Sequence, residues 1–104
     1  MANYLLVYKG GSMPDDDVTQ KAVMDAWGAW FGQLGDAVVD PGNPASGTRI
    51  LGPDGSVTAG DASSPTGYTI LRADSHDAAV ELARGCPVLA GGASIEVVET
   101  FDVM

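Results

Sequence analysis

A carboxylate at the end of an apolar run is the side chain of this sequence best placed to do chemistry. Asp40 follows Ala37-Val38-Val39 and precedes Pro41-Gly42, so we expect it at the end of a strand beside a cleft. A carboxylate there can act as a general base or hold a cationic ligand. The alternative is a turn residue whose side chain accepts a hydrogen bond from nearby backbone. The sequence leaves both interpretations open.

The single histidine, His76, is the second catalytic candidate. Paired with Asp77 it could transfer a proton, because histidine titrates near neutral pH. Neighbouring helix residues, however, point about 100° apart, so these two side chains do not face each other. That geometry favours a surface residue in the first turn of a helix.

Four polar side chains are candidates for contacts with a ligand. They are Tyr8, Arg49, Tyr68 and Glu96. The tyrosines can line a pocket with their rings while their hydroxyls orient a ligand. Glu96 alternates with Ile95 and Val97, so it points to the other face of its strand, where Arg72 can pair with it. The alternative for Glu96 is an ordinary cross-strand ion pair. The sequence does not decide which face of the first strand carries its tyrosines.

The motifs that would indicate a metal or a cofactor are missing. Asp15-Asp16-Asp17 lacks the alternating ligands and the closing Glu of a calcium loop. Cys86 has no CxxC partner, which argues against zinc and against a Cys-His nucleophile. Neither GxGxxG nor the phosphate-binding P-loop pattern occurs. We therefore expect no metal and no cofactor.

Length and charge narrow the function further. The 104 residues predict one domain that spans positions 1–104. A formal charge of −9 argues against nucleic acid and against anionic membrane surfaces, which need clustered Lys and Arg. No apolar run approaches the ~20 residues of a transmembrane helix. The N-terminus lacks the basic and apolar segments of a signal peptide, so we expect a cytoplasmic location.

The hydrophobic pattern predicts the order strand, helix, strand, hairpin, strand, helix, strand. We expect strands at 4–8, 37–40, 68–73 and 95–103, with a small hairpin from 48–51 and 56–58. A first helix opens at Pro14-Asp15-Asp16-Asp17, and a second is capped at Asp74-Ser75 and stops before Pro87. One face of the first helix is apolar: Val23, Trp27, Trp30, Phe31 and Leu34. Two helices on one face of an antiparallel sheet make a ferredoxin-like α+β fold.

The strands carry apolar residues on both faces, although two helices can cover only one. This holds for 4–8, for 68–71 and for Val97-Val98. An apolar sheet face of this kind should be buried against something. The simplest cover is a second copy of the chain, which predicts a two-fold homodimer.

Short motifs in a fixed order connect the chain to a known family. They are Trp27 to Gly35, Val39 to Pro44, Gly67 to Ile70, Asp77 to Ala83, Cys86-Pro87 and Gly91 to Val97. With these motifs the chain resembles the YCII-related proteins, and within them the DGPF-domain branch. The resemblance implies a ferredoxin-like fold assembled as a dimeric α/β barrel. Some relatives carry a His-Asp pair in a cleft, which implies lyase- or isomerase-like proton transfer without a cofactor.

Two functional hypotheses follow. The first is a protein that binds a small organic molecule in a cleft between the sheet and the Asp40-to-Pro65 segment, with proton transfer as the reaction class if it is an enzyme. The second is a non-catalytic interaction or regulatory module that uses its sheet face and the 41–66 loop. A concave site with a titrating group whose pKa is shifted favours the first. A flat apolar face favours the second.

Overall fold

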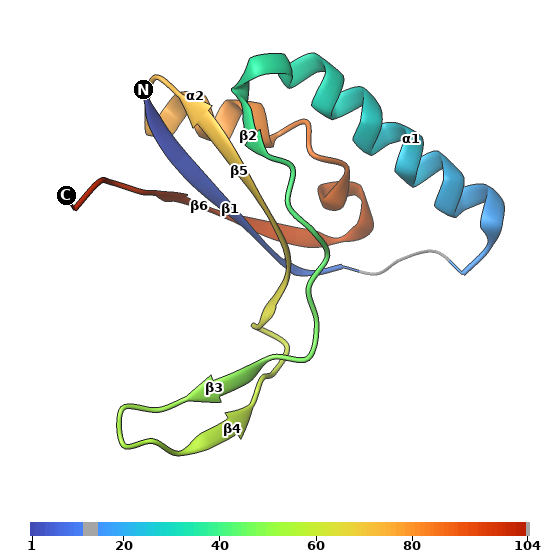
Figure 1. Ribbon diagram of the computed structural model, residues 1–104. Helices are drawn as coiled ribbons and strands as arrows, with labels where there is room; N and C mark the ends of the chain where they lie inside the picture. Colours follow the sequence, from blue (N-terminus) through green and yellow to red (C-terminus); the bar gives the residue numbers. More distant parts are fainter. Residues whose placement is uncertain (12–14, 104) are drawn as a thin grey trace.

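The computed structural model describes residues 1–11 and 15–103 (Figure 1). Its strands and helices follow the predicted order. They are β1 (Ala2–Gly10), α1 (Asp17–Leu34), β2 (Val38–Asp40), β3 (Arg49–Leu51), β4 (Val57–Ala59), β5 (Pro65–Ala73), α2 (His76–Ala83) and β6 (Ala93–Glu99). Two short 3-10 helices, η1 (Gly35–Ala37) and η2 (Pro87–Gly91), follow α1 and α2. The last strand is shorter than predicted and ends at Glu99.

A four-stranded antiparallel sheet forms the body of the molecule. Its strand order is β2-β5-β1-β6, while β3 and β4 form a separate two-stranded sheet. Both long helices lie on the same side of the larger sheet (Figure 1). The architecture is therefore ferredoxin-like α+β, and the predicted fold class is confirmed. None of the described helices is both long enough and apolar enough to span a membrane.

Helix α1 is set by its cap and by one aromatic face. Asp16 is the N-cap, and its carboxylate accepts a hydrogen bond of 2.8 Å from the Thr19 amide. Gly35 ends the helix with a positive φ of 54°. The predicted apolar face packs against the sheet, with Trp30 buried in the core and Trp27 partly buried beside it. Pro14, at which the helix was predicted to open, lies outside the described residues.

The side chains of β1 alternate strictly between the two faces of the sheet, which decides which face carries its tyrosines. Tyr4, Leu6 and Tyr8 are buried toward the helices, whereas Leu5 and Val7 point the other way and are only partly buried. On the helix side, Leu6 of β1 and Leu71 of β5 are both fully buried. The hydrophobic core therefore lies between the sheet and the two helices.

The other side of the sheet is the largest feature without a cover. We call it the open face. From β1, β5 and β6 its side chains are Asn3, Leu5, Val7, Lys9, Tyr68, Ile70, Arg72, Ser94, Glu96 and Val98, and at the edge Asp40 of β2 lies opposite Ile70. The apolar members sit at the centre, where Val7 pairs with Tyr68 and Leu5 pairs with both Ile70 and Val98. Within the described residues no helix covers this face, so a patch of partly exposed apolar side chains meets solvent in the single chain.

The hairpin β3–β4 stands apart from this body. Figure 1 shows it beyond one end of the sheet and away from both helices. Its large side chains are exposed: Ile50 to 48%, Leu51 to 72% and Val57 to 58%. The chain is correspondingly flat, with extents of 44 × 41 × 18 Å.

Candidate functional site

A hollow of about 520 Å³ lies where the hairpin joins the sheet. It is lined by Gly10 at the end of β1, by 45–48 and by the return segment 59–62 and 64–66. It lies mostly within the Asp40-to-Pro65 segment and meets the sheet at Gly10, Pro65 and Thr66, so a ligand cleft between the sheet and this segment stays a prediction. The hollow is broad and open to solvent rather than enclosed.

Backbone hydrogen bonds between the two crossing segments hold the hollow open. The Ala45 amide donates to the Thr66 carbonyl at 3.1 Å, and the Gly60 amide donates to the Thr48 carbonyl at 2.9 Å. The Thr66 hydroxyl contacts the carbonyls of Tyr8 and Gly10, each at 3.2 Å, and so ties the segment to the end of β1. The walls are therefore fixed by main-chain geometry rather than by large side chains.

The charged wall of the hollow is the turn at Asp61. Its carboxylate accepts hydrogen bonds from the Ser63 hydroxyl at 2.6 Å and from the Ser63 amide at 2.8 Å. The bond from the Ser63 hydroxyl is the largest of the effects that lower the pKa of Asp61, and Lys9 adds a smaller one. The side chain is thus a fixed carboxylate at neutral pH.

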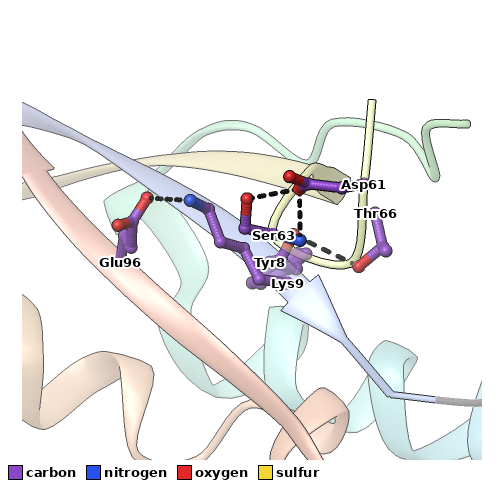
Figure 2. A network of polar contacts seen from close by, with 6 residues as sticks. All are labelled: Tyr8, Lys9, Asp61, Ser63, Thr66 and Glu96. Atoms are coloured by element: carbon purple, nitrogen blue, oxygen red, sulfur yellow. Dashed lines mark hydrogen bonds and ion pairs between the residues drawn. The ribbon is translucent and has the colours of Figure 1, made fainter. Parts of the chain in front are cut away.

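Lys9 connects the hollow to the open face. Its ammonium group lies 3.1 Å from the carboxylate of Glu96. Figure 2 shows the Lys9 side chain reaching from β1 to Glu96 on one side, with the turn of Asp61 and Ser63 on the other. A partly exposed pair of this kind contributes only about 0.2–1 kcal/mol to stability. Its importance is that it places a cation and two carboxylates together at one end of an apolar surface.

The predicted pairing of Glu96 with Arg72 is wrong. Glu96 lies opposite Val7, while Arg72 lies opposite Asn3, four residues away along β1. Both point from the open face, as the alternation predicted, but toward different ends of it. Lys9 is the partner because the β1–β6 register brings it diagonally beside Glu96.

Asp40 adopts the turn geometry that was the alternative to catalysis. Its carboxylate accepts a hydrogen bond of 2.8 Å from the Gly42 amide. The turn is tight, since Gly42 has a φ of 75° and packs directly on the carbonyl of Tyr68. Asp40 is partly buried and is not among the residues that line the hollow. A catalytic role for it stays a prediction.

Tyr8 lies in the core rather than on the open face. Its hydroxyl donates a 2.6 Å hydrogen bond to Thr69 Oγ1, and the Thr69 hydroxyl donates onward to the Pro41 carbonyl at 3.0 Å. Burial raises the pKa of Tyr8 well above its ordinary value, and the hydroxyl therefore stays protonated. Burial likewise raises the pKa of the Cys86 thiol in the same cluster. This buried polar chain links β1, β5 and the turn after β2.

His76 joins the second helix to the edge strand. Its Nε2 donates a hydrogen bond of 2.8 Å to the Val97 carbonyl on β6, and its ring lies 5.4 Å from that of Tyr4. The N-cap of α2 is the neighbouring Ser75. These contacts give His76 a structural role that requires no catalysis.

The candidate residues are therefore distributed over several places. Tyr68 and Glu96 share the open face, in one row across Val7. Arg49 opens the exposed hairpin, where it pairs with Ala59. Sequence reasoning missed Lys9, although its alternation with Leu5 and Val7 already placed it on their face. It also missed Asp61, whose Ser63 turn was a recognisable local signal.

Comparison of the chain with protein-family models, curated proteins and solved structures finds no significant match. Among the described residues, no three His, Cys, Asp or Glu side chains are grouped so that they could hold a metal ion. The side chains of the hollow that can form hydrogen bonds or ion pairs are those of Ser46, Thr48, Asp61, Ser64 and Thr66.

Proposed function

We propose that the protein works as a homodimeric α/β barrel of the YCII-related kind, in which the open faces of two copies pack together. The observation that carries this proposal is the apolar centre of the open face, which the chain's own helices leave uncovered. Burial of such a surface is the main driving force for protein association. A two-fold axis would bring the same patch of both copies together.

The distribution of charge supports the same assembly. Three basic and four acidic side chains belong to the open face, the hairpin and the loop beside it: Lys9, Arg49, Arg72, Asp40, Asp54, Asp61 and Glu96. Most of the net charge of −9 therefore comes from the rest of the molecule. Two copies can approach through this nearly balanced side without the repulsion that their other surfaces would cause.

We further propose that the hollow beside Lys9 binds a small organic molecule. The fixed carboxylate of Asp61 can orient a positively charged group, and the hydroxyl-bearing walls can accept or donate hydrogen bonds. Cofactor-independent proton transfer is the reaction class that the family resemblance adds, although neither residue predicted for it, Asp40 or His76, lines the hollow. A cytoplasmic location completes the proposal.

A thermal-shift screen against small carboxylates, lactones, aromatic acids and amines tests the ligand. A ligand at 100 times its dissociation constant adds about 2.7 kcal/mol, and each kcal/mol shifts the melting temperature of such a domain by roughly 4–8 °C. Asp61→Asn should abolish the shift given by a cationic ligand.

Asp54→Asn is the matched control, since Asp54 makes the same turn with Ser56 at the tip of the hairpin, outside the hollow. A shift that survives Asp61→Asn and disappears in Asp40→Asn would place the site at the turn after β2 instead. A panel without any hit would overturn the ligand and favour the second function, a module that binds another protein. The exposed apolar side chains of the hairpin are the observation that favours this alternative.

A further inference from the structure

The hairpin β3–β4, which we call the arm, has an apolar side that the rest of the chain leaves uncovered. An isolated two-stranded hairpin is marginally stable in water. Leu51 pairs with Val57, and Arg49 pairs with Ala59. Because alternate side chains share a face, these four residues form one side of the hairpin, and three of the four are apolar. That side is exposed in the single chain, as the 72% exposure of Leu51 shows.

The arm and the open face both present apolar side chains that are uncovered in the single chain. The arm offers Leu51 and Val57, and the open face offers an apolar centre around Val7 and Ile70. The hairpin lies beyond the end of its own sheet, where β3 and β4 make their main contacts with each other (Figure 1). Its apolar side is therefore left for another molecule.

We infer that the hairpin of each copy reaches past the packed open faces and lies against the end of the second copy's open face, and that this exchange of arms completes the dimer. The inference rests on the proposed dimer and adds how its surfaces engage. Each chain carries both an arm and an apolar surface, so one two-fold axis satisfies both contacts at once. The nearly balanced charge of these two elements fits a second copy, whose matching surfaces are equally close to balance.

Paramagnetic relaxation in mixed dimers tests the exchange directly. A nitroxide is attached to Leu51→Cys in an unlabelled chain, which is mixed with ¹⁵N-labelled wild type. Cys86 is buried in the core and so is protected from the reagent. We expect loss of the amide signals of Val7, Ile70 and Val98 in the labelled copy. A nitroxide at Met24→Cys, on the exposed side of α1, should leave these signals unchanged.

The dissociation constant of the dimer tests the same contact without a label. Leu51→Asp should fold, since the side chain is exposed, but should raise the dimer dissociation constant by about tenfold or more. Met24→Asp is the control and should leave that constant unchanged.

The outcomes separate the two proposals. A dimer whose open-face signals survive the label at position 51, and whose dissociation constant is unaffected by Leu51→Asp, would overturn the exchange of arms but keep the dimer. If the label at position 51 weakens amide signals only in the helices of the ¹⁵N-labelled copy, the exchange of arms would be overturned and the contact would lie elsewhere. A monomer would overturn both, while leaving ligand binding at the hollow to be judged by the thermal-shift screen.

Discussion

Replacing Thr69 by Val should destabilise the protein far more than the loss of one hydroxyl suggests. Thr69 is fully buried, and its hydroxyl both accepts from Tyr8 and donates to the Pro41 carbonyl. Valine keeps the shape but leaves a buried tyrosine hydroxyl without its acceptor and a carbonyl without its donor. Each buried polar group that loses its partner costs about 1–3 kcal/mol. For the two groups together we therefore expect a loss of roughly 2–6 kcal/mol.

Tyr8→Phe is the matched partner for a double-mutant cycle. It removes only the donor, and Thr69 can still donate to Pro41, so the expected cost is about 0.5–1.5 kcal/mol. In the double variant, no tyrosine hydroxyl is left unpaired. The combined cost should therefore fall short of the sum of the two single costs by about 1 kcal/mol.

Urea unfolding at one fixed protein concentration measures all four proteins, because association makes apparent stability depend on concentration. Additive costs would refute the reasoning. So would a Thr69→Val variant within about 0.5 kcal/mol of wild type, which is the usual range for a surface substitution.

Three further predictions follow from single contacts. Gly42→Ala should lower the free energy of unfolding by more than about 2 kcal/mol, because the new methyl group would overlap the Tyr68 carbonyl. Gly47 has a similar φ of 73° but open space around it, so Gly47→Ala should cost only about 1–2 kcal/mol. Thermal unfolding compares the two variants. Stability should fall above pH 10 or so, because the raised pKa keeps Tyr8 protonated in the native state while the unfolded chain ionises, and urea unfolding of Tyr8→Phe should show a shallower alkaline fall. Asp40→Asn should leave stability within about 0.5 kcal/mol of wild type, since the amide oxygen can still accept from Gly42; a larger loss would show that the negative charge itself matters.

Sequence patterns predicted well those elements that depend only on residues close together in the chain. The spacing of Trp27, Trp30 and Phe31 marks one helical face, and that face packs on the sheet. Gly35 and Ser75 end and begin the helices as their capping chemistry requires. The uncovered sheet face was also predictable, because two helices can cover only one face of a sheet whose strands are apolar on both.

The candidate site was harder to predict because it depends on register and on main-chain geometry. An all-apolar run such as 4–8 has no polar residue to reveal which face is buried, so the placement of Tyr8 was undecided. The pairing of Glu96 with Lys9 depends on how β6 aligns with β1, which neither strand encodes alone. The hollow is walled by hydrogen bonds between the backbones of 45–48 and 59–66, which leave little trace in side-chain patterns.

The solution mass at micromolar concentration is the most direct test of the homodimer. We expect a mass twice the 10.6 kDa of one chain for the wild-type protein. We also expect a shift toward the single-chain mass when a charge is placed at the centre of the open face by Ile70→Asp. The mass of one chain for wild type, or a dimer unaffected by Ile70→Asp in a folded variant, would show that the open face does not hold two copies together.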